Sequence, residues 1–123
     1  MKKKLLLIIN PAAGRGAYKN SFAEAMHLLS RGGFETTLAF TAGPGDATRL
    51  AAEHAADYAL VACIGGDGTL SEVLAGLMRV PSPPPVGYLR GAKVVLLYRN
   101  FLKPKHPPLL WRTTPDLQRL HYT

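Results

Sequence analysis

The chain has 123 residues, of which 47% are hydrophobic, and a formal net charge of +7. This length suits one domain, the apolar fraction argues against a disordered chain, and the single cysteine excludes a disulfide framework or a multi-cysteine zinc site. The charge is uneven, because residues 1–86 hold eight Lys and Arg against seven Asp and Glu, whereas residues 87–123 hold seven against one. The basic character, which can indicate nucleic-acid or membrane partners, therefore belongs to the last third of the chain.

The N-terminus resembles a secretory signal only in part. Three lysines precede the apolar run Leu5–Ile9, which has five residues. A signal peptide needs an apolar core of about seven to fifteen residues. Asn10 and Pro11 end the run, and no apolar run approaches the roughly 20 residues of a membrane span. We therefore predict a cytoplasmic protein and leave peripheral contact with a membrane open.

Three runs of apolar, β-branched and aromatic residues predict the strands of a sheet. They are Leu5–Ile9, Phe34–Phe40 and Leu60–Ile64. The first and third runs do not alternate with polar residues, a pattern typical of parallel strands that are covered on both faces. Cys63 lies in the third run and is expected to be a buried, inert thiol.

A segment with helical periodicity follows each predicted strand. Capping residues predict where each helix starts: Ser21 with Glu24, then Asp46, then Thr69 with Glu72. In the third helix, apolar residues spaced three and four apart predict the buried face, namely Leu70, Val73, Leu74, Leu77 and Met78. The alternation of strands and helices predicts an α/β fold of three layers, with helices packed on a parallel sheet.

Glycine-rich loops follow the first and third predicted strands, at residues 10–16 and 65–68. In a parallel sheet both loops lie at the carboxyl edge, where ligands bind, and Thr41 lies there as well. Glycine lets the backbone approach phosphate closely, and free N–H groups at a helix start attract anions. The P-loop and dinucleotide-binding glycine patterns are both absent. The loops therefore predict a phosphate site of another kind.

The segment 65–69, Gly-Gly-Asp-Gly-Thr, has three interpretations. A hairpin would need an alternating strand after the turn, but the following residues have a helical period. A purely structural turn from strand to helix remains open. In the functional interpretation, Asp67 holds Mg²⁺ directly or through water, while backbone N–H groups bind the phosphates.

Four other side chains near the loops also have two interpretations. The Asn10 amide could reach a nucleotide or only fix its own loop, and Arg15 could pair with a phosphate or remain in solvent. Thr41 could donate a hydroxyl hydrogen bond to a ligand or be an ordinary turn residue. Glu72 could belong to the site or serve only as the capping partner of the third helix.

The glycine motifs resemble the diacylglycerol kinase catalytic domain, and in particular bacterial diacylglycerol and related lipid kinases. The matching segments are 10–16 (Asn-Pro-Ala-Ala-Gly-Arg-Gly), 41–47 and 65–73 (Gly-Gly-Asp-Gly-Thr-Leu-Ser-Glu-Val). NAD kinases share the Gly-Gly-Asp-Gly-Thr element, and phosphofructokinases have a related loop. The order and spacing of all three segments make the resemblance specific over about residues 3–87.

The resemblance implies a two-domain enzyme that transfers the γ-phosphoryl group of ATP to a lipid hydroxyl, such as that of diacylglycerol at the membrane surface, with Mg²⁺. Carried over by motif, the ATP or ADP contacts fall on Asn10, Pro11, Ala12, Ala13, Gly14, Thr41, Gly65, Gly66, Asp67, Gly68, Thr69, Leu70, Ser71 and Glu72. Asp67 is the candidate metal ligand. The resemblance places the base in the second domain, so no catalytic residue is assigned. We expect no specific nucleic-acid partner and leave a homo-oligomer open.

The resemblance stops near residue 87. The family continues with a Pro-Gly-Thr loop and an Asn-Asp-Phe-like element, whereas this chain reads Tyr-Leu-Arg-Gly-Ala-Lys at 88–93. We therefore divide the chain into an ATP-binding lobe, 1–87, and a basic, proline-rich tail, 88–123, expected to be poorly ordered apart from one strand near 93–98. Our hypothesis is that the tail results from a frame change or a premature end in the gene. Reading the surrounding DNA in the other two frames tests this hypothesis.

The predicted function is the ATP-binding lobe of a lipid kinase, truncated and weakly active or inactive alone. One alternative is a non-catalytic module whose basic tail binds a membrane or nucleic acid, which would make binding depend on salt. Another is an enzyme like NAD kinase. The Asn-Pro-x-x-Gly-x-Gly opening argues against it, and a panel of substrates would decide.

Overall fold

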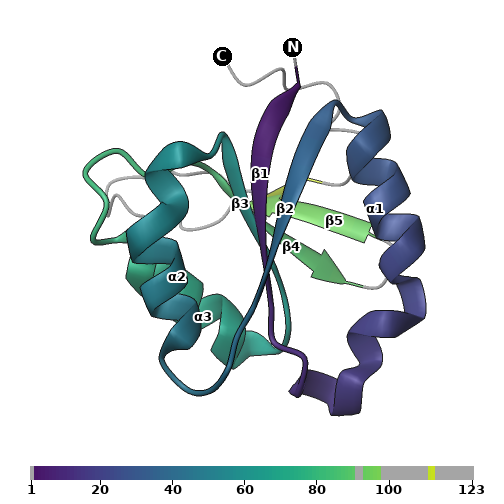
Figure 1. Ribbon diagram of the computed structural model, residues 1–123, viewed down its shortest axis with the longest axis horizontal. Coiled ribbons are helices and arrows are strands. Elements are labelled where there is room, and N and C mark those ends of the chain that lie inside the picture. The colour runs from purple at the N-terminus through teal and green to yellow at the C-terminus, as the bar shows by residue number, and fades with distance from the viewer. Residues whose placement is uncertain (1, 91–92, 98–110, 113–123) are drawn as a thin grey trace.

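The computed structural model describes residues 2–90, 93–97 and 111–112 of the chain (Figure 1). Within these ranges the strands form one sheet in the order β2-β1-β3-β4-β5-β6. The strands are β1 Lys3–Ile9, β2 Phe34–Phe40, β3 Leu60–Ile64, β4 Val86–Arg90, β5 Lys93–Leu97 and β6 Trp111–Arg112. The first four are parallel, whereas β5 pairs antiparallel with β4 and β6 antiparallel with β5. The predicted α/β fold is confirmed.

Helices cover both faces of the sheet. They are α1 Phe22–Arg31, α2 Asp46–His54 and α3 Asp67–Leu77, with 3-10 helices η1 Ala13–Ser21 and η2 Ala55–Asp57. α1 lies against one face, and α2 and α3 lie side by side against the other (Figure 1). The three predicted layers are therefore present.

The unbroken apolar run of β1 fills both halves of the core, because successive side chains of a strand point to opposite faces. Leu5, Leu7 and Ile9 pack in the cluster that includes Ala25 and Leu29 of α1. Leu6 and Ile8 pack in the other cluster, together with residues of α2 and α3 such as Ala51, Val73 and Leu77. A central strand covered on both faces explains the absence of polar alternation in β1.

β2 and β3 have the bounds that the sequence predicts, but β1 begins earlier than expected. The prediction started it at Leu5, where the apolar run begins. In the structure Lys3 and Lys4 also belong to the strand, because they pair with Phe34 and Glu35 of β2. Hydrogen bonding to a neighbouring strand therefore extends β1 beyond its hydrophobic residues.

The predicted starts of the second and third helices are wrong by one and three residues, respectively. Gly45 is the N-cap of α2 and Gly66 is the N-cap of α3, so Asp46 and Asp67 are the first helical residues. Thr69 lies within the first turn of α3 instead of capping it. Glycine lacks the side-chain acceptor of the usual N-cap residues, and neither cap forms a side-chain hydrogen bond. The capping box of Thr69 with Glu72 does not form.

Two smaller expectations about the helices also differ from the structure. α1 begins at Phe22, directly after Ser21 as predicted, but Ser21 is the last residue of η1 and therefore continues a helical course instead of starting one. Met78 is 70% exposed, although helical spacing predicted that it would be buried. α3 ends at Leu77, and the position after its end no longer follows the buried face.

Residues 88–90 continue β4, so the predicted boundary between 87 and 88 falls inside a strand. The strand expected near 93–98 is present as β5, which forms an antiparallel hairpin with β4. The remaining tail, at 98–110 and 113–123, lies outside the described residues. The prediction that the tail is poorly ordered concerns these residues and therefore stays a prediction. No helix in the described ranges is long and apolar enough to cross a bilayer.

Candidate functional site

The order of the strands creates one place where two neighbouring strands lead in opposite directions. β1 is central: the chain passes through α1 to β2 on one side of it, and later through α2 to β3 on the other side. The loops that follow β1 and β3 therefore diverge at the carboxyl edge of the sheet. Such a divergence opens a crevice, which is where parallel α/β sheets bind ligands.

An open pocket of about 650 Å³ lies at this edge, within the range of small-molecule sites. Its walls come from the loops after β1, β2 and β3 and from α2 and α3. They are lined by Asn10, Pro11, Ala12, Ala13, Gly14, Thr41, Ala42, Gly43, Pro44, Ala47, Gly66, Gly68, Thr69 and Glu72. Ten of the fourteen residues that the motifs assign to a nucleotide thus line one pocket.

The other four predicted residues lie beside this pocket without lining it. Gly65 borders an adjacent cavity of about 360 Å³. Asp67 and Ser71 are exposed on α3. Leu70 is half-buried and packs against the core cluster beneath α2 and α3. Sequence reasoning in turn missed four lining residues, Ala42, Gly43, Pro44 and Ala47, although the matching segment 41–47 was a signal for them.

Asn10 connects the loop after β1 to the start of α3. Its Nδ2 donates to Oγ1 of Thr69 at 3.3 Å, and its Oδ1 accepts from the Ala12 N–H at 3.0 Å. The Asn10 N–H donates to the carbonyl of Ile64 at the end of β3, at 3.0 Å. The side chain therefore fixes its own loop and also joins the two loops that diverge at the crevice.

Gly65 is required by close packing against Thr69. A Cβ added at Gly65 would lie 2.7 Å from the Cβ of Thr69, whereas a Cβ at Gly66 or Gly68 would meet nothing within 4 Å. Thr69 is 6% exposed, a buried polar residue whose hydroxyl accepts from Asn10. Gly65 thus lets the turn fold onto the first turn of α3.

The first N–H groups of α3 belong to the Gly66–Gly68 turn, and Gly66 and Gly68 line the pocket. The N–H groups at the start of any α-helix have no partner within the helix. In the part of the chain that the structure describes, those of Asp67 and Gly68 donate to no protein acceptor. Together with the dipole of the helix, they favour an anion at the Gly66–Gly68 turn.

The loop after β1 contains three consecutive residues in the left-handed conformation. The φ angles of Gly14, Arg15 and Gly16 are 58°, 56° and 81°. For a residue with a side chain this conformation costs about 1–2 kcal/mol, whereas the glycines on both sides of Arg15 adopt it readily. The Arg15 side chain is exposed. These three residues lie inside η1 and interrupt its helical course.

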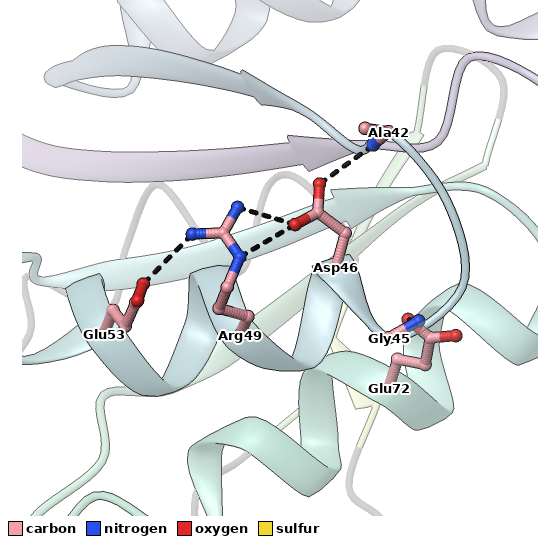
Figure 2. Close-up of polar contacts among 6 residues, drawn as sticks. All are labelled: Ala42, Gly45, Asp46, Arg49, Glu53 and Glu72. Carbon is pink, nitrogen blue, oxygen red and sulfur yellow. Dashed lines mark hydrogen bonds and ion pairs between the residues drawn. The ribbon is translucent and has the colours of Figure 1, made fainter.

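The loop after β2 forms another wall of the pocket, and three of its N–H groups, those of Thr41, Ala42 and Gly45, donate to the protein. The Thr41 N–H donates to the carbonyl of Ile9 at 2.8 Å. The Ala42 N–H donates to Oδ2 of Asp46 at 2.8 Å, and the Gly45 N–H donates to Oε1 of Glu72 at 3.1 Å (Figure 2). Glu72 is therefore neither a capping partner of Thr69 nor a free side chain, because it reaches across to α2.

Two titratable groups near the pocket have clearly shifted pKa values. The Ala42 N–H, and then the Arg49 guanidinium, lower the pKa of Asp46 below its ordinary value. Asp46 in turn raises the pKa of Arg49, with a smaller contribution from Glu53. Cys63 is buried as predicted, and this burial raises the pKa of its thiol to about 12, so the thiol stays protonated and unreactive.

The described residues offer little to a metal ion by themselves. Within 2–90, 93–97 and 111–112, no group of three or more His, Cys, Asp and Glu side chains is placed to hold one. Asp67 supplies a single exposed carboxylate at the start of α3. Mg²⁺ is commonly held by one or two carboxylates together with phosphate oxygens and water. Asp67 fits that arrangement and does not form a metal site alone.

The sheet order and the pocket define an α/β protein with a pocket at the switch point of a largely parallel sheet. Residues 4–91 match the diacylglycerol kinase catalytic domain. Diacylglycerol kinases of Staphylococcus haemolyticus (strain JCSC1435) and Staphylococcus saprophyticus are 38% and 36% identical, over 72% of this chain and 27% and 30% of those proteins. A solved diacylglycerol kinase from Bacillus anthracis str. Sterne superposes with a TM-score of 0.64 at 32% identity, over 72% of this chain and 33% of that one.

The matched residues make up more than half of the chain, which therefore belongs to the diacylglycerol kinase catalytic domain family. This confirms the resemblance seen in the three sequence motifs. The chain spans about three tenths of the length of the curated relatives it matches.

Proposed function

We propose that the chain binds ATP or ADP in the 650 Å³ pocket and forms the nucleotide-binding part of a lipid kinase. The observation that carries this proposal is the meeting of the three family motifs around one pocket at the switch point. In the proposed reaction the oxygen of a lipid hydroxyl bonds to the γ-phosphorus as the bond to the bridging oxygen breaks. ADP leaves with the electron pair, and the hydroxyl proton is released.

The open N–H groups of the Gly66–Gly68 turn are the proposed phosphate contacts, because they combine close backbone approach with a helix N-terminus. Thr41 and Asn10 both line the pocket, at the ends of the paired strands β2 and β1, where a hydroxyl and an amide can orient the nucleotide. Mg²⁺ would be held by Asp67 together with phosphate oxygens and water, and would neutralise phosphate charge. These roles are for binding and orientation.

The acceptor is proposed to be a lipid hydroxyl such as that of diacylglycerol, which places the reaction at a membrane surface next to the cytoplasm. No described residue is assigned as the base, and the described acidic residues form no metal cluster. We therefore expect little or no phosphoryl transfer by the 123-residue chain alone. Robust ATP-dependent phosphorylation of diacylglycerol by the purified chain would contradict this part of the proposal.

A calorimetric titration of the whole chain with ATP, with and without Mg²⁺, tests the proposal. Binding is expected in both series and should be tighter with Mg²⁺. Asp67→Asn is expected to remove most of the gain from Mg²⁺, because it removes one anionic ligand. Asp57→Asn is the matched control, since Asp57 is exposed in η2 and lies outside the pocket.

A chain that binds no ATP under either condition would contradict the proposed function. Equal losses in Asp67→Asn and Asp57→Asn would leave nucleotide binding standing but contradict the assignment of Asp67 to the metal.

A further inference from the structure

Two carboxylates from different helices hold the wall of the pocket formed by residues 41–45 (Figure 2). Asp46, at the start of α2, accepts a hydrogen bond from the Ala42 N–H at 2.8 Å. Glu72, on α3, accepts one from the Gly45 N–H at 3.1 Å. A loop of five residues is therefore fixed near both of its ends by charged acceptors, which form stronger hydrogen bonds than neutral ones.

Arg49 orients the Asp46 carboxylate. Its Nε and Nη2 both donate to Oδ1 of Asp46, at 2.9 and 2.6 Å, which leaves Oδ2 for the Ala42 N–H. One turn further along α2, Nη1 of Arg49 donates to Glu53 at 3.0 Å. The carboxylate that holds Ala42 is thus fixed by a fork of two hydrogen bonds from one guanidinium.

Glu72 connects this wall to the helix that begins at the open Gly66–Gly68 turn. The Thr48 hydroxyl donates to the backbone carbonyl of Glu72 at 2.8 Å. Lower down, a Cβ added at Gly76 would lie 2.8 Å from the Cβ of Ala51. α2 and α3 therefore pack too closely to slide past each other without repacking. The wall and the open turn are parts of one rigid pair of helices.

We propose that Asp46 and Glu72 are positioning residues, which order the wall at 41–45 before a nucleotide arrives. This inference rests on the nucleotide binding proposed above. A preformed wall raises affinity because the loop then has little conformational freedom left to lose on binding. Glu72 acts through the Gly45 backbone in this role, which differs from the direct nucleotide contact that the motif assigns to it.

A double-mutant cycle of Asp46→Ala and Glu72→Ala in the whole chain tests the proposal. Each single change is expected to weaken ATP binding about fivefold, the effect of one hydrogen bond to an exposed charged group. The double variant is expected to lose much less than the roughly 25-fold product, because either change alone frees the loop. Losses that multiply would overturn the proposal, since they would indicate two independent contacts.

Exchange of the Ala42 and Gly45 amide hydrogens, followed by NMR in the nucleotide-free chain, gives a second readout. Either substitution is expected to speed exchange at both amides, because the two carboxylates hold one loop. Exchange that accelerates only at the amide that lost its acceptor would overturn the proposal. If the wild-type chain bound no ATP, the proposed function would fail. If amide exchange were unchanged in both variants, the positioning role alone would be contradicted and the proposed function would stand.

Two further variants separate positioning from charge and from general stability. Glu72→Gln keeps an acceptor oxygen for the Gly45 N–H and is expected to retain most of the ATP affinity. If Glu72 instead contacted a ligand or metal through its charge, Glu72→Gln would lose as much affinity as Glu72→Ala. Glu53→Ala is the matched control on α2, because it removes a carboxylate from Arg49 but leaves the fork to Asp46. It should leave both affinity and amide exchange unchanged.

Discussion

Two glycine-containing loops face the same pocket and differ in how many of their backbone N–H groups donate to the protein. In the loop at 65–68, the N–H groups at the start of α3 have no protein acceptor among the described residues and are available to a ligand. In the loop at 41–45, Thr41, Ala42 and Gly45 all donate to the protein. Glycine content alone therefore does not identify the loop that binds anions. What distinguishes the two is whether nearby carbonyl and carboxylate groups already accept the N–H hydrogens.

The largest expected effect comes from breaking the packing beneath the wall. Gly76→Ala places a Cβ against the backbone of α2 and 2.8 Å from the Cβ of Ala51, so α2 must move away from α3. We expect a loss of about 2 kcal/mol in the free energy of unfolding, because overpacking outweighs the better helix propensity of alanine. Urea denaturation measures it, with Ala75→Ser on the exposed side of α3 as the control. An unchanged midpoint would mean that the helices are free to separate.

A smaller effect is expected from disturbing the open turn itself. Gly65→Ala brings a Cβ to 2.7 Å from that of Thr69, a side chain that can rotate at the expense of its bond to Asn10. We expect a loss of about 1 kcal/mol in stability and a clear loss of ATP affinity, because the turn is displaced. Gly66→Ala is the matched comparison, since its Cβ would meet nothing within 4 Å and should leave thermal stability unchanged. Equal destabilisation by both changes would contradict this description of the turn.

The smallest expected effect is a pH dependence of the free energy of unfolding, which arises from the Asp46 carboxylate that holds the wall at 41–45. The pKa of Asp46 in the folded chain is lower than its ordinary value of 3.8, so its ionised form stabilises the fold above that pH. This contribution is lost as the pH falls through the folded-state pKa. The stability difference between the wild type and Asp46→Asn should thus be constant near neutral pH and close below about pH 4. When Asp46→Asn is made in an Arg49→Met background, this stability difference should disappear at a higher pH, because the pKa of Asp46 is then closer to its ordinary value. A difference between wild type and Asp46→Asn that is the same at pH 7 and pH 3 would contradict the mechanism.

The architecture could be predicted from the sequence because its signals are local. A segment rich in β-branched and aromatic residues identified β2 and a continuous apolar run identified β3, each with its bounds, and the alternation of strands with helices identified the layers. The pocket position followed from topology, since loops after parallel strands share one edge. The helix starts were harder to place, because the preceding glycines Gly45 and Gly66 serve as N-caps without the side-chain signal on which such predictions depend.

The roles of Asp46 and Glu72 could not be read from the sequence. In the sequence Glu72 follows Thr69 at the spacing of a capping box, whereas its partner in the structure is Gly45, 27 residues earlier. The partner becomes visible only when α2 and α3 are packed side by side. Ala42, Gly43 and Pro44 lie in the matching segment 41–47, but only the fold shows that they line the same pocket as the glycine turn.

The central position of β1 has a consequence for the order in which the fold can be completed. β1 precedes β2 and β3 in the chain, and it pairs with β2 on one side and with β3 on the other. Its second edge remains unpaired until Leu60–Ile64 has been made, and contacts between segments so far apart in sequence form slowly. An apolar strand with an open edge is prone to aggregation. The nascent chain is therefore most vulnerable to aggregation before the third strand has left the ribosome.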